Sequence, residues 1–295
     1  MFTRRLLRVL GHQRGLRFGL RDRVLRFFDN PDHTTSEEFV VPFYGASYRG
    51  NFDTFIDWST YYYGAYERDD LELIGDLLAC LDDPVFVDVG ANVGHHTLFA
   101  ATRSQRVIAI EPFPPLIERL RQKIADNALT NVTVVVCGLG AQDGTAPYLP
   151  AAGHNTGMGR FGEGQGGRTI SLPIRRGDDV IAEASADRVS FIKIDAEGFE
   201  RAVLRGFSRT LATRRPLVFV EWSRGDSGRA LFPEGYSFFR RRADQITLGV
   251  LRRRVDALEP LTAVWPEADI LALPNEFIAR VKTMPASPCA ARMAQ

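Results

Sequence analysis

The chain has few of the features that mark a specialised class of protein. Its 295 residues include only three cysteines, and Cys80, Cys137 and Cys289 match no metal-ligand spacing. No apolar run approaches the length that crosses a bilayer, and the arginine-rich start lacks the apolar segment of a secretory signal. We therefore expect a protein of a reducing compartment, the cytoplasm.

Two nucleotide-binding motifs are also missing. No G-x-x-x-x-G-K-S/T string occurs, which argues against a phosphate-binding loop. The dinucleotide motif G-x-G-x-x-G fails because, counted from Gly90, Asn92 and His95 stand where the second and third glycines belong. A nicotinamide oxidoreductase is therefore disfavoured. The net charge of +1 gives no global field that would mark a nucleic-acid binder.

What the chain does contain is a strand, a glycine loop and a helix start at residues 85–98. The apolar run Val85–Val89 predicts a buried strand, and Gly90 allows a turn that other residues resist. The next predicted strand, 106–111, ends in Glu111, whose carboxylate can accept hydrogen bonds from both hydroxyls of a ribose. A single glycine loop with a ribose-binding acid suits S-adenosylmethionine.

Strand and helix patterns alternate through the middle of the chain. We expect buried strands at 85–89, 106–111, 132–137, 189–194 and 217–220, with helices between most of them. Such alternation predicts a parallel sheet with helices on both faces. Residues 236–239 and 270–273 are predicted to close the sheet as an antiparallel pair. The hydrophobic share of 45% is sufficient to fill such a core.

Four segments in this order resemble the FkbM family of methyltransferases. They are D-V-G-A-N-V-G at 88–94, I-E-P at 110–112, F-I-K-I-D-A-E-G-F-E at 191–200 and R-P-L-V-F-V-E at 215–221. The resemblance spans roughly residues 61–222. It implies a Rossmann-like class I methyltransferase fold of the α/β class, with a mostly parallel seven-stranded sheet. It also implies S-adenosylmethionine as cofactor and O-methylation of a hydroxyl on a sugar, polysaccharide or secondary metabolite.

We predict three parts of the chain. Residues 1–80 form a basic extension of helices and short strands, residues 81–283 the methyltransferase domain, and residues 284–295 a disordered tail. Residues 1–30 carry eight arginines and two aspartates among apolar side chains. This segment either rests on anionic lipid at the inner face of the membrane or docks on its own domain with a solvated charged face.

The predicted cofactor residues come from the strand ends. The loop supplies Asp88, Gly90, Ala91, Asn92 and Gly94, and the following strand supplies Glu111. By resemblance, the turn at Gly138 and Leu139 lies against the adenine ring, and Glu67 contacts the cofactor. Each of two residues has an alternative interpretation. Asp88 could be structural and bond the turn amides of its own loop. The segment around Glu67 could instead form an aromatic cluster at one end of the sheet.

A hydroxyl acceptor needs a base within hydrogen-bond reach. Asp195 follows the predicted strand 189–194 and is the first candidate, with Glu197 and then Glu221 next. The same carboxylates could also bind Mg²⁺, so dependence on a divalent metal is an alternative that we do not favour. His154 and Asn155, in a long glycine-rich loop, are candidate substrate contacts, because the family carries an N-x-G pattern there.

Two rivals remain at this point. An RNA 2′-O-methyltransferase would need a continuous basic face with stacking aromatics, and the arginines at 240–242 and 252–254 keep it open. The preferred interpretation of those arginines is a solvated surface. A non-catalytic cofactor-binding scaffold would bind the cofactor with Asp195 turned away from it. The acceptor's identity and the oligomeric state do not follow from the sequence.

Overall fold

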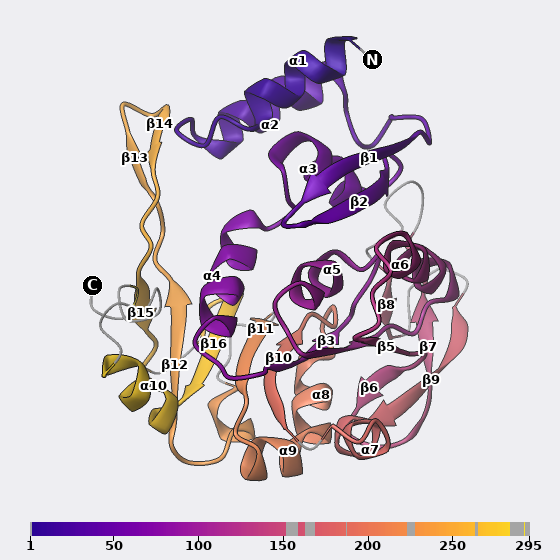
Figure 1. Ribbon diagram of the computed structural model, residues 1–295, viewed down its shortest axis with the longest axis vertical. Coiled ribbons are helices and arrows are strands. Elements are labelled where there is room, and N and C mark those ends of the chain that lie inside the picture. The colour runs from indigo at the N-terminus through magenta and orange to yellow at the C-terminus, as the bar shows by residue number, and fades with distance from the viewer. Residues whose placement is uncertain are drawn as a thin grey trace.

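A computed structural model describes residues 2–151, 159–162, 169–186, 188–222, 228–262, 265–283 and 292. Its centre is an eight-stranded sheet with the strand order β15-β12-β16-β11-β10-β3-β4-β5 (Figure 1). The pairs that link β5, β4, β3, β10 and β11 are all parallel, whereas β16 runs antiparallel to both of its neighbours. The predicted Rossmann-like fold is confirmed, with β15 as one short strand more than expected.

The sheet strands have the following bounds: β3 Val85–Val89, β4 Arg106–Ile110, β5 Val132–Val135, β10 Val189–Ile194, β11 Leu217–Trp222, β12 Tyr236–Arg241, β15 Leu258–Pro260 and β16 Ala268–Pro274. The flanking helices are α4 Arg68–Leu78, α5 His95–Ala101, α6 Pro114–Asp126, α7 Gly177–Glu183, α8 Glu200–Gly206, α9 Ser208–Thr213 and α10 Asn275–Lys282, with a 3₁₀ turn at Arg229–Leu231. The helix predicted near 199–213 is thus two helices that meet at Phe207.

The central strands bury both faces, as their near-continuous apolar sequence requires. Along β3, Val85, Val87 and Val89 face the core formed with α7, α8 and α9, while Phe86 faces the core formed with α4, α5 and α10. All five residues of β3 are buried. The period of two along each strand therefore divides the interior into two cores, one on each side of the sheet.

A second, four-stranded sheet lies beside the carboxyl end of β5. Its order is β6-β9-β7-β8, built from β6 Gly138–Gly140, β7 Gly144–Leu149, β8 Arg160–Phe161 and β9 Ile170–Arg176. β6 and β7 lie on opposite sides of β9, so the turn at 141–143 does not form a hairpin between them. This sheet carries the aromatic side chains that cover the candidate site.

The N-terminal region consists of α1 Phe2–Gly11, α2 Phe18–Phe28, the hairpin of β1 Glu38–Phe43 and β2 Ala46–Asn51, and α3 Phe55–Tyr63. Leu7 and Leu25 pack against Trp58, Tyr62 and Tyr63 of α3. Through these apolar side chains, α1 and α2 pack on α3. The boundary predicted at residue 80 stays a prediction.

A hairpin that we did not predict reaches up to this region. Strands β13 Gln245–Thr247 and β14 Leu251–Arg253 form it, and we refer to residues 245–253 as the arm. Its tip meets the α1–α2 connection, where the Arg17 amide donates to the Val250 carbonyl at 2.7 Å and the Arg252 amide donates to the Gly15 carbonyl at 2.8 Å. Figure 1 shows the arm standing beside α4 and ending next to α2.

Candidate active site

A cleft opens at the carboxyl ends of β3, β4 and β10, where a parallel sheet places the loops that bind ligands. Its lining includes most of the loop residues that the sequence singled out. The lining includes Gly90, Asn92, Glu111, Gly138, Leu139, Tyr148, Phe161, Asp195, Glu197 and Phe199. Of the predicted site residues, Gly90, Asn92, Glu111, Gly138, Leu139, Asp195 and Glu197 therefore meet in one place.

Gly90 joins the loop after β3 to the loop after β10. Its φ is +76°, and a Cβ added there would lie 1.9 Å from the carbonyl oxygen of Asp195. The Asp195 amide also donates to the Val89 carbonyl at 3.1 Å. Glycine is thus required at this position both by backbone conformation and by the close approach of Asp195.

Glu111 is buried at the end of β4 and ties two loops together. Its Oε2 accepts from the Asn92 amide and its Oε1 from the Phe113 amide, both at 2.9 Å. Burial raises the pKa of this carboxyl to about 7, against the opposing effect of the two amides. Each carboxylate oxygen has a second lone pair, so Glu111 can still accept from the hydroxyls of a ribose in the cleft.

Four aromatic rings line or flank the far side of the cleft, and sequence reasoning missed them. Phe113 stacks on Tyr148 with ring centroids 5.3 Å apart, Tyr148 meets Phe161 edge-on at 5.3 Å, and Phe161 packs on Phe199 at 5.4 Å. A Cβ at Gly138 would lie 2.4 Å from the Phe161 ring, so that ring packs directly on the Gly138 backbone. The aromatic residues on either side of the glycine-rich segment were the available signal.

Three predicted cofactor residues lie behind the cleft instead of lining it. Asp88 is fully buried and accepts from the Thr97 hydroxyl at 2.6 Å, so it links β3 to α5. Ala91 packs into a small core with Leu120, and a Cβ at Gly94 would lie 2.6 Å from the Leu120 side chain. A cofactor contact of Asp88 thus stays a prediction, while Ala91 and Gly94 shape the loop that carries Asn92.

Glu67 also lies outside the cleft lining. It precedes α4 with a left-handed φ of +45° and lines a second pocket, between α3, α4 and the arm. Burial, followed by the negative charges of Asp195 and Asp269, raises its pKa to about 8. Its carboxyl therefore lies within electrostatic range of the cleft through Asp195, and a direct cofactor contact stays a prediction. The tyrosines before it pack in the α3 aromatic cluster.

Asp195 belongs to a group of acids around one buried lysine. The Lys193 ammonium lies 3.1 Å from Asp195 Oδ2 and 3.9 Å from Asp88 Oδ1. Burial and then the charge of Asp195 raise the pKa of the Glu221 carboxyl, and burial raises that of Asp269 to about 7. The carboxyl groups of Glu221 and Asp269 thus lie within electrostatic range of Asp195.

The other predicted site residues are less central. Glu197 lines the cleft from a left-handed turn with φ +47°, and burial, followed by Asp195, raises its pKa. Among the residues that the structure describes, no group of three or more His, Cys, Asp or Glu side chains could hold a metal ion. His154 and Asn155 lie outside the described residues.

The chain is similar to known methyltransferases. The methyltransferase FkbM domain matches residues 88–246, more than half of the chain. The hexuronic acid methyltransferase AglP of Haloferax volcanii is 29% identical over 130 residues, which are 44% of this chain and 52% of that protein. Methyltransferase sdnD of Sordaria araneosa is 27% identical over 223 residues, covering 61% of this chain and 85% of that protein.

Among solved structures, a methyltransferase FkbM from Methylobacillus flagellatus is 21% identical with a TM-score of 0.39. The match covers 55% of this chain and 40% of the Methylobacillus flagellatus chain. The chain thus spans about half the length of AglP and less than half the length of the Methylobacillus flagellatus methyltransferase.

Proposed function

Because this chain belongs to the FkbM methyltransferase family, we propose that it transfers a methyl group from S-adenosylmethionine to a hydroxyl oxygen of a sugar, polysaccharide or secondary metabolite. The observation that carries the proposal is the meeting of three strand ends at one cleft. Gly90 touches the backbone of Asp195 there, and Glu111 reaches the same cleft from β4. Similarity to the hexuronic acid methyltransferase AglP of Haloferax volcanii favours a glycan acceptor.

The residues of the cleft fit this cofactor. Glu111 offers a buried carboxyl for the two ribose hydroxyls, and Gly138 and Leu139 offer a flat apolar wall for a purine. Phe161 packs on Gly138 beside this wall. When bound, S-adenosylmethionine supplies a methyl group that its sulfonium makes electrophilic. The protein's part is to orient the acceptor and to receive its proton.

Asp195 is the residue that we assign as base. Its carboxylate pairs with Lys193 and lines the cleft, so it can accept the proton of an acceptor hydroxyl as the new carbon–oxygen bond forms. Glu67 and Glu221 border it with raised pKa values, the first at about 8.

The first experiment is calorimetric titration of the purified protein with S-adenosylhomocysteine, with NAD as control. We expect saturable binding of S-adenosylhomocysteine alone, since the cleft lacks the glycines of a dinucleotide loop. Binding would then justify a screen of glycan acceptors with labelled S-adenosylmethionine. Failure of S-adenosylhomocysteine to bind would remove the proposed activity and favour the scaffold rival.

The two rivals find less support. The arginines of 240–254 mostly form ion pairs, such as Arg252 with Asp244 and Arg254 with Glu72. Arg252 and Arg254 are thus largely buried in ion pairs, whereas Arg240, Arg242 and Arg253 are exposed, as we predicted for a solvated surface. With most of these charges paired, the arginines in the described part of the chain do not form the continuous basic face that an RNA substrate needs. The scaffold rival requires Asp195 to point away from the cofactor site, whereas Asp195 lines the cleft.

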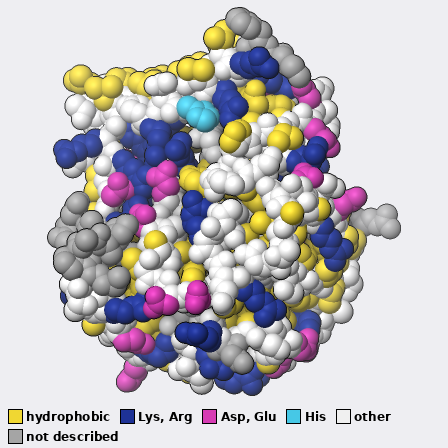
Figure 2. All heavy atoms as spheres, in the orientation of Figure 1, with side chains coloured by type: hydrophobic (Ala, Val, Ile, Leu, Met, Phe, Trp, Pro, Cys, Tyr) yellow, Lys and Arg dark blue, Asp and Glu magenta, His cyan; other side chains and the backbone are white. Residues whose placement is uncertain are grey.

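We also propose that the N-terminal helices and the arm touch an anionic membrane surface. Ten of the twelve exposed large hydrophobic side chains among the described residues lie in α1, α2 and the arm, so they form one surface instead of a scatter. Figure 2 shows hydrophobic side chains gathered along the upper edge of the molecule, beside basic ones. This combination favours anionic lipid. In the described part of the chain, no helix has the length and apolarity to pass through a bilayer.

A further inference from the structure

The second pocket, which Glu67 lines, is separate from the cofactor cleft. Its walls come from α2, α3, the start of α4, β12 and the arm, and we call it the arginine pocket. Glu67 lines this pocket, and Asp195, which lines the cofactor cleft, is the charge that most raises the pKa of Glu67 after burial. Glu67 of this pocket and Asp195 of the cofactor cleft therefore lie within electrostatic range of each other.

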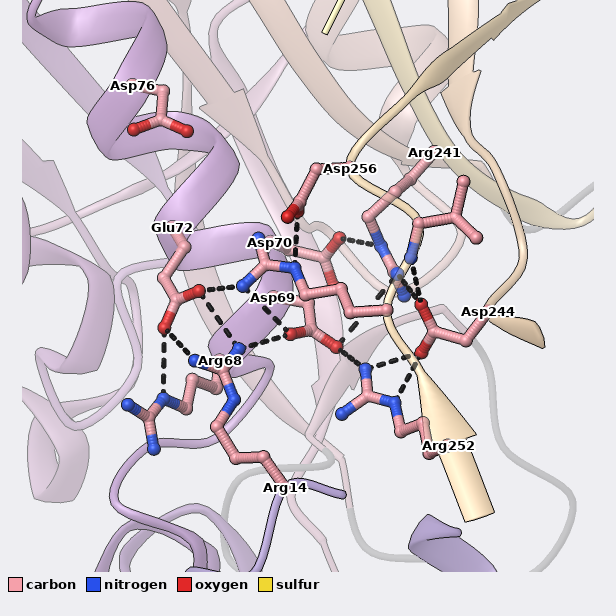
Figure 3. Close-up of polar contacts among 12 residues, drawn as sticks. Arg14, Arg68, Asp69, Asp70, Glu72, Asp76, Arg241, Asp244, Arg252 and Asp256 are labelled. Carbon is pink, nitrogen blue, oxygen red and sulfur yellow. Dashed lines mark hydrogen bonds and ion pairs between the residues drawn. The ribbon is translucent and has the colours of Figure 1, made fainter. Parts of the chain in front are cut away.

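Most arginines of the pocket wall already have carboxylate partners. Arg14 binds Asp69 and Glu72, at 2.9 and 3.0 Å, and Arg252 binds Asp69 and Asp244. Figure 3 shows these pairs joining α4 to the arm and to Arg14, which comes from the α1–α2 connection. The pairs hold the walls in place, and their acids have little capacity left to neutralise a further cation.

Arg21 differs from these arginines. It is 4% exposed and lines the pocket, and no carboxylate among the described residues lies within ion-pair distance of it. One guanidinium nitrogen donates to the Gly11 carbonyl, but Nε has no hydrogen-bond partner. Burial and then the positive charge of Arg252 lower its pKa. A buried cation in this state is stabilised when an anion enters beside it.

Other groups in the wall suit a sugar. Ser59 is 2% exposed, and its hydroxyl has no hydrogen-bond partner although it lines the pocket. Phe18 packs on Tyr63 with ring centroids 5.1 Å apart, and Phe55 meets Tyr66 at 5.9 Å. Aromatic walls with a few unsatisfied polar groups are typical of small-molecule sites, and ring faces pack well against the C–H face of a pyranose.

We propose that the arginine pocket binds the methyl acceptor, and that Arg21 selects an acceptor with an anionic group: a uronic acid or a sugar phosphate. This inference rests on the proposed methyltransferase function. The anion pairs with Arg21, the sugar ring packs on the aromatic wall, and a ring hydroxyl extends past Glu67 toward Asp195. The N-terminal helices and the arm thus complete the acceptor site.

The test is calorimetric titration of the full chain, saturated with S-adenosylhomocysteine, with three probes of similar size. They are methyl β-glucuronide, glucose 1-phosphate and methyl β-glucoside. We expect one or both anionic probes to bind and the neutral glucoside not to bind; which anion binds identifies the source of the charge. Preference for the glucoside, or binding of none of the three, would overturn the assignment.

The variant that tests Arg21 is Arg21→Gln, with Arg23→Gln as the matched control, since Arg23 is exposed on the same helix. Arg21→Gln should lower the affinity for the anionic probe at least about tenfold, because a charge-assisted hydrogen bond is lost. Arg23→Gln should not change it. Affinity for S-adenosylhomocysteine, measured in parallel, should stay constant in both variants and shows that Arg21→Gln has folded.

The two proposals fail in different ways. Wild-type protein that does not bind S-adenosylhomocysteine overturns the methyltransferase function. Wild-type protein that binds it, together with equal probe affinity in Arg21→Gln and Arg23→Gln, overturns only the role of Arg21. If Arg21→Gln does not fold, the second variant is Arg21→Lys, which keeps the charge without the planar guanidinium. We expect this variant to keep its selectivity for the anionic probe over methyl β-glucoside. Lost selectivity in that folded variant would overturn the role of charge.

Discussion

Replacing Gly90 by alanine adds one methyl group where the loops after β3 and β10 touch. Two costs are expected. A non-glycine residue in the left-handed region costs about 1–2 kcal/mol, and the added carbon would lie 1.9 Å from the Asp195 carbonyl oxygen. Relief of that overlap requires the two loops to separate, and forced overpacking typically costs about 1–3 kcal/mol more.

Gly45 supplies the matched control, because it separates the two costs. Its φ is +91°, and a Cβ added there has no neighbour within 4 Å. Gly45→Ala should therefore lower the free energy of unfolding by about 1–2 kcal/mol through backbone strain alone. Gly90→Ala should lower it by about 2–5 kcal/mol in total.

The decisive assay is the affinity for S-adenosylhomocysteine, measured by calorimetry beside denaturant unfolding. Separation of the loops moves Asn92 and Asp195 apart, so we expect Gly90→Ala to bind at least about tenfold more weakly, a loss of about 1.4 kcal/mol. Gly45→Ala should bind like the wild type. Wild-type affinity in folded Gly90→Ala would refute the idea that this contact shapes the cofactor cleft.

Three further predictions concern the acids and the apolar surface. Asp195→Asn should lower kcat about 10²- to 10⁴-fold with unchanged affinity for S-adenosylhomocysteine, because an amide cannot receive the proton. The free energy of unfolding should fall as the pH rises from about 5 to 8, because Glu67, with a folded pKa of about 8, binds its proton more tightly in the folded state. Glu67→Gln should reduce this pH dependence by at most about 1.4 kcal/mol per pH unit. Leu248→Ser combined with Phe27→Ser should reduce co-sedimentation with phosphatidylserine vesicles, because both side chains are exposed on the proposed membrane surface.

Controls for these experiments come from exposed positions elsewhere. Glu118→Gln removes a carboxyl on the surface of α6 and serves for both acid variants. Val136→Ser removes an exposed apolar side chain far along the chain from the helices and the arm. Full activity in Asp195→Asn would remove Asp195 as the base. Equal vesicle binding by the double variant and Val136→Ser would contradict the membrane contact.

The positions of the central strands and their parallel direction followed from the sequence alone. Apolar runs of period two, separated by helical spacing, determine a doubly wound sheet because parallel strands need crossover helices. The same rule brings Gly90, Glu111 and Asp195 to one cleft, since each directly follows or ends a strand. These predictions depend on local pattern and on topology, and neither requires knowledge of which distant side chains meet.

The tertiary structure decided what distant segments do to each other. Asp178 lies in the first turn of α7, yet its carboxylate accepts from the amides of Arg209 and Thr210 at the start of α9. The arginines of the arm could have paired with any acid or with solvent, and only the fold brings Arg252 to Asp69. Glu67 became part of a second pocket, and Arg21 was left without a carboxylate, for the same reason. A charge pair needs only closeness in space, and the sequence does not record the distance between residues that the chain brings together from far apart.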